Sequence, residues 1–448
     1  MADLCEMGAA EAARRIRQGE LSPAELLAAC LARIDAVDPR VRAWVRVDRD
    51  GAAAIAGERS RQARATSVQG ALHGVPWAAK DVLDAAGLPT TAGAPAFAHR
   101  RPDADATAVA RLRTAGAVLV GKVSTTAFAF LDPTATRNPW NLEHTPGGSS
   151  SGPAAAVAAR MVPLALGTQT VGSVLRPAAY CGVVGFKPTH GRIGATGVVP
   201  LAASLDHVGI FARSVEDAAL ALSVLAGFDP ADPFAIDAPV DDYLAAVARP
   251  RSPRLGVLRE LIERASPDLG EHLRGVLKRC ASAGAEVVAV DLPPSFARVH
   301  DAAGAVVRAE AAAHHKALFD AHGAEYPPRV REAIAEGRAL RAMDYVAALE
   351  TRRAFRREMA AAAAPFDALV LPAASGPAPR GLESTGDPYF CAPWSFVGFP
   401  AIAIPTGLDA ARLPLSAQLV AGPFAEARLL GAAAWCEGVA AFAGSPAL

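Results

Sequence analysis

Two serine-containing turns and one lysine are the residues of this chain best suited to covalent chemistry. Residues 147–152 read Gly-Gly-Ser-Ser-Ser-Gly, and a second small-residue turn places Ser173 directly after Gly172. Such turns expose backbone N–H groups beside a hydroxyl, and acyl transfer needs both a nucleophile and donors for a carbonyl oxygen that becomes negative. These residue types therefore favour an acyl-transfer site in which Lys80 is the base, Ser149 the relay and Ser173 the nucleophile.

Lys80 ends a short, mostly apolar run, residues 74–80, that is typical of a buried strand. Burial disfavours the charged form of an amine and lowers its pKa, and only a neutral lysine can accept a proton. Asp81 follows directly, but successive side chains of a strand point to opposite faces. We therefore expect the Asp81 carboxylate to lie away from the Lys80 amine.

Further segments accompany these residues and are densest between residues 72 and 225. They are residues 72–76 (LHGVP), 87–93 (GLPTTAG), 138–141 (NPWN), 177–189 (PAAYCGVVGFKPT), 191–192 (GR), 204–209 (SLDHVG) and 398–405 (GFPAIAIP). Together with the serine turns they resemble the amidase signature family of serine hydrolases, over nearly the whole chain. The resemblance implies one mixed sheet layered by helices and an active site without a cofactor.

The resemblance also implies a role for each member of the site. Ser173 would be the nucleophile and Lys80 the base, while Ser149, after a cis Gly148–Ser149 bond, would relay the proton between them. The N–H groups of residues 170–173, namely Thr170, Val171, Gly172 and Ser173, would form the oxyanion hole. Ser150 would support the lysine or serve as a turn hydroxyl.

Residue 171 departs from the commonest pattern of the family, which has glycine where this chain has Val171. Valine would be strained if the position required a positive φ, and its side chain would narrow the acyl pocket. Arg176 is either a structural arginine bound to backbone carbonyls or an anchor for a carboxylate or polar group of the substrate. Gln169 is a further predicted substrate-binding residue. The candidate pocket walls are aromatic: Phe128, Phe130, Trp140, Trp394 and Phe396.

Composition limits the class of protein. The chain has 448 residues, of which 52% are hydrophobic and 20% charged, so it can bury a large core. Lys plus Arg equals Asp plus Glu at 45 each, which gives no overall field for nucleic acid or an anionic membrane. Six scattered cysteines, no apolar leader at the N-terminus and no apolar run of membrane-spanning length favour a cytoplasmic protein. The histidine and cysteine spacings predict no metal site.

Hydrophobic periodicity predicts alternating helices and strands along the chain. A capping box at Ser22 opens a predicted helix over 23–36, and further helices are predicted over 51–66, 105–115, from 214, over 268–282 and over 424–440. Predicted strands are 41–47, 117–121, 254–258, 286–290, 368–371, 401–404 and 415–420. This alternation favours a layered α/β architecture.

We expect a single domain over residues 1–448. Residues 1–65 would be an N-terminal helical region, 72–225 the core that carries the motifs, and 226–448 the rest of the sheet with the helices that form the pocket. Residues 228–234 are the best linker candidate, but apolar strands lie on both sides of them. The fold that the resemblance implies, one mixed sheet layered by helices, would make them an internal crossover.

Three functions compete at this point. The leading prediction is a stand-alone amidase that cleaves a small carboxamide to a carboxylate and ammonia or an amine. It would act as a monomer or a homodimer. In a variant of this prediction, the substrate is an amide or urea-type compound that bears a carboxylate, which Arg176 anchors. The second is the glutaminase component of a tRNA-dependent amidotransferase, against which the balanced charge counts modestly. The third is an inactive binding protein of the same fold, which the retained lysine and serines disfavour.

Overall fold

The computed structural model describes residues 2–65, 67–68 and 70–448, and within them the central element is an 11-stranded sheet. The strand order is β1-β3-β2-β4-β6-β5-β10-β11-β9-β7-β8. The two neighbours of β2 and the two neighbours of β7 pair with them in parallel, and the other pairs are antiparallel. The predicted mixed α/β sheet is thereby confirmed. The strands are β1 (Trp44–Val47), β2 (Pro76–Lys80), β3 (Val118–Val123), β4 (Leu164–Gln169), β5 (Val184–Lys187), β6 (His207–Ala212), β7 (Arg254–Leu258), β8 (Glu286–Val290), β9 (Ala368–Pro372), β10 (Ala401–Leu408) and β11 (Pro414–Val420).

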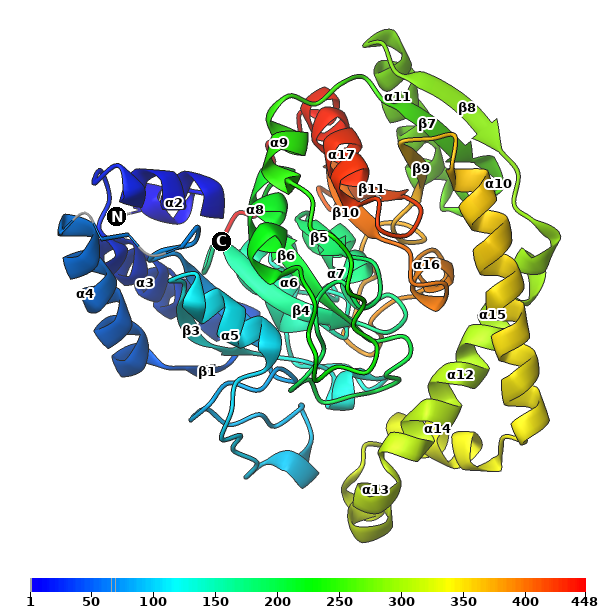
Figure 1. The fold of residues 1–448 in the computed structure, drawn as a ribbon, viewed down its shortest axis with the longest axis horizontal. Helices are drawn as coiled ribbons and strands as arrows, with labels where there is room; N and C mark the ends of the chain where they lie inside the picture. The colour runs from blue at the N-terminus through cyan, green and yellow to red at the C-terminus, as the bar shows by residue number, and fades with distance from the viewer. Residues whose placement is uncertain (1, 66, 69) are drawn as a thin grey trace.

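Helices cover both sides and one end of this sheet (Figure 1). They are α1 (Ala2–Cys5), α2 (Ala9–Arg17), α3 (Pro23–Val41), α4 (Arg49–Arg64), α5 (Thr107–Thr114), α6 (Ser151–Ala158), α7 (Leu175–Cys181), α8 (Val215–Leu225), α9 (Tyr243–Ala248), α10 (Arg259–Arg264), α11 (Pro267–Ser282), α12 (Val299–His314), α13 (Lys316–His322), α14 (Pro328–Ala339), α15 (Ala342–Ala363), α16 (Ala392–Phe396) and α17 (Glu426–Ala440). Short 3₁₀ turns occupy Pro95–Phe97, Ala127–Ala129, Pro294–Arg298 and Gly323–Glu325.

Most predicted elements are present, with differences at their ends. The helix that the Ser22 capping box opens runs to Val41 rather than to residue 36, because Val37 and Val41 continue its buried stripe. The predicted strand 41–47 accordingly begins only at Trp44. The last residue of the predicted helix 51–66 lies outside the described residues, and α4 ends at Arg64.

Two regions of the fold bear directly on the site. The core of the sheet contains β2 and β4, every residue of which is buried. Opposite the N-terminal helices α3 and α4, the helices α12, α14 and α15 form an elongated layer that we call the arm (Figure 1). Residues 228–234, the linker candidate, lie in the loop between α8 and α9, so they connect two parts of one domain.

Candidate active site

Lys80 is the last residue of β2 and is completely buried. Its Nζ lies 2.7 Å from Ser149 Oγ, 2.8 Å from Thr168 Oγ1 and 3.5 Å from the Thr168 carbonyl oxygen. A neutral amine has two N–H donors and one lone pair, so Thr168 can accept both donors while the lone pair faces the Ser149 hydroxyl. This geometry suits a base that takes its proton from Ser149.

The electrostatics of Lys80 favour the neutral form. Burial lowers the pKa of Lys80 well below its usual range, and the charge of Asp206 opposes that shift. The neighbouring Asp81 carboxylate is also buried, but it pairs with Lys122 Nζ at 3.0 Å. As expected from strand alternation, Asp81 therefore has its own partner and does not neutralise the catalytic candidate.

The first serine turn is held against β4. The Gly148–Ser149 peptide bond is cis, in agreement with the family resemblance, and Ser149 is 1% exposed. Ser150 Oγ donates to the Thr168 carbonyl oxygen at 3.1 Å, and the Ser150 N–H donates to the Ser173 carbonyl oxygen at 3.3 Å. Ser150 thus supports Lys80 through Thr168 and joins the two serine turns.

The second turn, residues 170–173, connects β4 to α7 and carries Ser173, which is 9% exposed. Gln169 holds this turn, because its Oε1 accepts the N–H groups of Val174 and Leu175 at 2.8 and 3.0 Å. Its Nε2 donates to Ser395 Oγ at 2.9 Å. The structure therefore places Gln169 as a support of the second serine turn, and a direct contact with substrate stays a prediction.

Val171 does not have a positive φ, so the strain that a left-handed conformation would cause is absent at this residue. Its side chain lines a cavity of about 420 Å³ between the turn and the arm. Charged residues from both sides line the same cavity, among them Arg308, Glu336 and Asp387. We identify this cavity as the candidate substrate site. That Val171 narrows it stays a prediction.

Arg176 points into the protein rather than into that cavity. It is 5% exposed, and its Nη2 donates to the Gly148 carbonyl oxygen at 2.7 Å and to Thr385 Oγ1 at 3.1 Å. Its Nε has no hydrogen-bond partner within the described residues. The contacts match the structural interpretation, in which Arg176 fixes the turn before Ser149. The alternative role as a substrate anchor stays a prediction.

The aromatic candidates lie deeper than expected. Phe128 is fully buried, stacks on Tyr326 at 4.7 Å and packs edge-on against His315 at 4.7 Å. Trp394 is also fully buried, with its ring 6.2 Å from that of Phe355. Both rings belong to the core behind the pocket, and of the aromatic candidates it is Phe130 that lines the 420 Å³ cavity.

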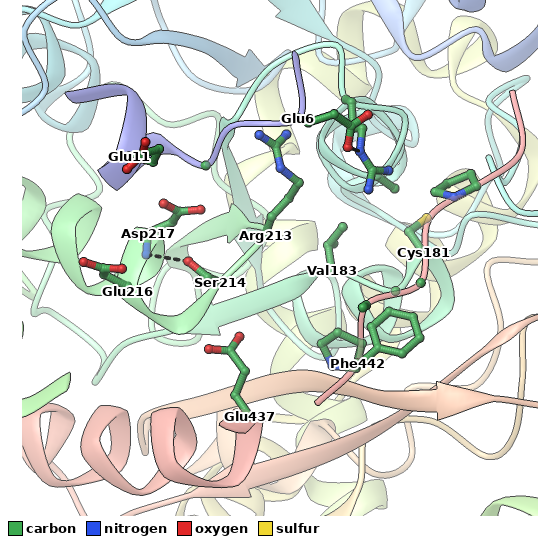
Figure 2. A pocket seen from close by; sticks show the side chains of 18 of the residues that line it. Glu6, Glu11, Cys181, Val183, Arg213, Ser214, Glu216, Asp217, Glu437 and Phe442 are labelled. Atoms are coloured by element: carbon green, nitrogen blue, oxygen red, sulfur yellow. Dashed lines mark hydrogen bonds and ion pairs between the residues drawn. The ribbon is translucent and has the colours of Figure 1, made fainter. Parts of the chain in front are cut away.

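Another cavity, of about 340 Å³, lies at the far end of α7 and is lined by charged groups (Figure 2). Two of the carboxylates that line it, Asp217 and Glu437, have structural partners. Asp217 Oδ1 accepts the Ala10 N–H near the start of α2 at 2.7 Å, and Glu437 accepts the Val215 N–H at the start of α8. Carboxylates at helix N-termini are stabilising, so this cavity is interpreted as a junction between helices.

Two residues near Lys80 were missed by the sequence analysis, Thr168 and Asp206. Asp206 was inside the motif at 204–209 and Thr168 lies just before the second serine turn, but a side-chain contact across strands leaves no local pattern. In residues 2–65, 67–68 and 70–448, no group of three or more His, Cys, Asp and Glu side chains could hold a metal ion. No helix in the described part of the chain is long and apolar enough to cross a membrane.

Comparison with known proteins gives a consistent result. Residues 25–430 match the Amidase family. One component of the glutamyl-tRNA(Gln) amidotransferase of Roseiflexus castenholzii is 39% identical, with 96% of this chain and 95% of that protein covered. The solved structure of native peptide amidase from Stenotrophomonas maltophilia is 31% identical, with a TM-score of 0.85 and 98% of each chain covered.

A second solved structure, described as part of a vestigial protein complex that reveals the evolutionary origins of an s-triazine catabolic enzyme, has a TM-score of 0.90 at 29% identity. It covers 96% of this chain and 98% of its own. Fold, family match and relatives agree, and the chain belongs to the amidase signature family of enzymes that act on carbon–nitrogen amide bonds.

Proposed function

We propose that this chain hydrolyses a primary carboxamide through an acyl-enzyme on Ser173, and that its substrate is glutamine. The observation that carries the chemistry is the buried Lys80 amine, which lies 2.7 Å from Ser149 Oγ. Ser149 lies in the first serine turn, and the Ser150 N–H of that turn donates a hydrogen bond to the Ser173 carbonyl oxygen. A base, a relay and a nucleophile are thus supplied by three adjacent segments.

In the proposed reaction, Ser173 Oγ attacks the amide carbon while its proton passes to Ser149 and the Ser149 proton passes to Lys80. The N–H groups of residues 170–173 stabilise the oxyanion. The proton then returns through Ser149 to the departing nitrogen, which leaves as ammonia. Water hydrolyses the acyl-enzyme by the same route and yields a carboxylate and free Ser173.

Glutamine is supported by the charges of the candidate substrate cavity and by the relatives. A free amino acid carries an ammonium and a carboxylate group, and the cavity beside Val171 offers Asp387 and Arg308 as complementary partners, although Arg308 already pairs with Glu336 at 3.5 Å. The relatives from Roseiflexus and Anaeromyxobacter are named as components of a glutamyl-tRNA(Gln) amidotransferase. In this proposal the chain works with partner proteins that consume the ammonia and bind tRNA.

A stand-alone amidase is the second candidate. It is favoured by the peptide amidase structure, which has the same fold over 98% of each chain, and by the apolar walls of the cavity at Phe130, Val171 and Val307. In that case a neutral amide would be the substrate, and the chain alone, as a monomer or a homodimer, would be fully active. A cytoplasmic location stays a prediction in both cases.

Ammonia release from glutamine and from a panel of neutral and acidic amides distinguishes the candidates. The purified chain and a preparation with its copurified partners are compared, with Ser173→Ala as the control in each. Preference for glutamine that rises with partners supports the amidotransferase assignment, and efficient hydrolysis of neutral amides by the chain alone supports the amidase. Amide hydrolysis by Ser173→Ala at the wild-type rate would overturn the proposed nucleophile.

A further inference from the structure

Asp206 is a half-buried carboxylate outside the proposed triad, and it holds residues 170–173, which we call the nucleophile turn. Its Oδ1 accepts the Thr170 hydroxyl at 2.5 Å, and its Oδ2 accepts the N–H groups of Leu201 and Ala202 at 2.8 and 3.0 Å. Three donors fix the carboxylate. Thr170 is the first residue of the turn that ends at Ser173, so the position of that turn depends on Asp206.

Two residues earlier, Ser204 is held by the arm. Its N–H and Oγ donate to the two carboxylate oxygens of Glu310, on α12, at 3.0 and 2.6 Å. Arg352, on α15, donates to the Ser204 carbonyl oxygen at 2.8 Å and to its Oγ at 3.2 Å. Tyr345 Oη donates to Glu310 Oε1 at 3.0 Å. Two helices of the arm thus meet on one serine.

We propose that residues 204–206 couple the arm to the nucleophile turn, with Asp206 as a positioning residue that orients Thr170. The inference rests on the proposed function, since it assigns the turn a part in transition-state stabilisation. The arm also lines the cavity at Val171 through α12 and α14. Occupation of that cavity, or a partner that binds the arm, therefore changes the geometry of residues 170–173 through Ser204 and Asp206.

The charge of Asp206 has a second consequence, at Lys80. Burial raises the pKa of Asp206 to about 6, and its negative charge above that pH raises the pKa of Lys80. The charge of Glu310, on α12, acts on Asp206. Asp206 also lines a cavity of about 220 Å³, whose other titratable lining residues are His190, Asp232 and His314. Removal of the negative charge at residue 206 should therefore make Lys80 harder to protonate.

The first test is Asp206→Asn, with steady-state kinetics on the amide that the wild-type enzyme hydrolyses best. We expect kcat to fall at least about tenfold with KM changed by less than about twofold, because a misplaced turn affects the transition state most. The acidic limb of the profile of kcat/KM against pH should move to lower pH. Thr170→Val should lower kcat similarly, and the double variant should lose little more.

The second test concerns the arm. Glu310→Gln weakens the contact with Ser204 and should lower kcat about two- to fivefold, by the loss of a charge-assisted hydrogen bond. Asp344→Asn, on α15, is the matched control, since Asp344 pairs with the exposed Arg341 at 2.8 Å. It should retain the wild-type kcat.

The outcomes separate the inference from the proposed function. If Asp206→Asn, Thr170→Val and Glu310→Gln all keep kcat within twofold and an unshifted pH profile while Ser173→Ala is inactive, the coupling is wrong and the hydrolase assignment stands. If Ser173→Ala is as active as the wild type, the proposed function fails instead. Should Asp206→Asn not fold, by circular dichroism, Thr170→Val and Glu310→Gln decide, because both leave the Asp206 carboxylate in place.

Discussion

Thr168→Val tests whether Thr168 orients the catalytic base. The substitution keeps the size and the branching of a buried strand residue and removes only the hydroxyl that lies 2.8 Å from Lys80 Nζ. A hydrogen bond of this kind contributes about 0.5–1.5 kcal/mol, or about 2- to 12-fold in rate if it acts in the transition state. We therefore expect kcat to fall by about that factor, with KM unchanged.

The pH profile gives a second, independent readout for the same variant. The Thr168 hydroxyl accepts an N–H of Lys80 and stabilises its charged form more than its neutral form. Removal of that acceptor lowers the already depressed pKa of Lys80. The acidic limb of kcat/KM against pH should accordingly move to lower pH, although kcat on the plateau is reduced.

The assay is steady-state release of ammonia between pH 5 and 9, with Thr168→Ser as the control. Serine retains the hydroxyl and loses only a methyl group, so it should keep most of the activity. If Thr168→Ser loses as much kcat as Thr168→Val, the loss cannot be assigned to the hydroxyl, because serine retains it and valine does not. If Thr168→Val retains wild-type kcat and profile, the hydroxyl does not orient Lys80 and the reasoning is refuted.

Three further predictions concern residues around the site and in the helix junction. Arg176→Lys should lower kcat for acidic and neutral amides alike, because Arg176 holds the Gly148 carbonyl oxygen; a loss confined to acidic amides would show a substrate anchor instead. Val171→Gly should raise kcat/KM for amides with a bulkier acyl group relative to small ones, since Val171 lines the 420 Å³ cavity; equal effects on both would contradict this. Burial raises the pKa of Glu437 from 4.5 to about 7. The folded state then binds the Glu437 proton more tightly than the unfolded state does. Protonated Glu437 therefore contributes fully to the free energy of unfolding below about pH 4.5. This contribution, up to about 3 kcal/mol, is lost as the pH rises to about 7. Glu437→Gln should become more stable relative to the wild type over that range in urea unfolding, and a difference that does not vary with pH would refute the assignment.

Sequence predicts the site residues that lie in local motifs, and it misses those that reach the site through contacts between strands. Lys80 and the serine turns were found because their small-residue and apolar surroundings are local in sequence. Thr168 and Asp206 escaped because they approach Lys80 and Thr170 through strand pairing, in which β4 lies between β2 and β6. Phe128 and Trp394 were misplaced toward the pocket, since an aromatic residue near a motif has no sequence signal that distinguishes the core from a cavity wall.

The strands of the sheet were easier to predict from the sequence than the position of the arm. Strands such as β7 and β8 begin and end at the predicted residues because short apolar runs between turns define them. The helices of the arm pack against one another, against α16, against the Pro294–Arg298 turn and against the Ser204 loop. Nothing in residues 299–363 indicates in advance where that layer will lie. Its contact with the nucleophile turn is a property of the assembled molecule.

Strand alternation explains how Lys80, next to an aspartate, can keep the low pKa that its proposed role as a base requires. Ala79 pairs with Lys122 across β2 and β3, so the side chains of Ala79, Asp81 and Lys122 share one face of the sheet, while Lys80 lies on the other. Lys122 neutralises Asp81 on its own face at 3.0 Å. The negative charge that reaches Lys80 is that of Asp206, which three hydrogen bonds hold in place. Burial thus sets the low pKa of Lys80, and the charge that opposes this shift comes from Asp206, a residue distant in sequence, while the adjacent Asp81 is paired with Lys122.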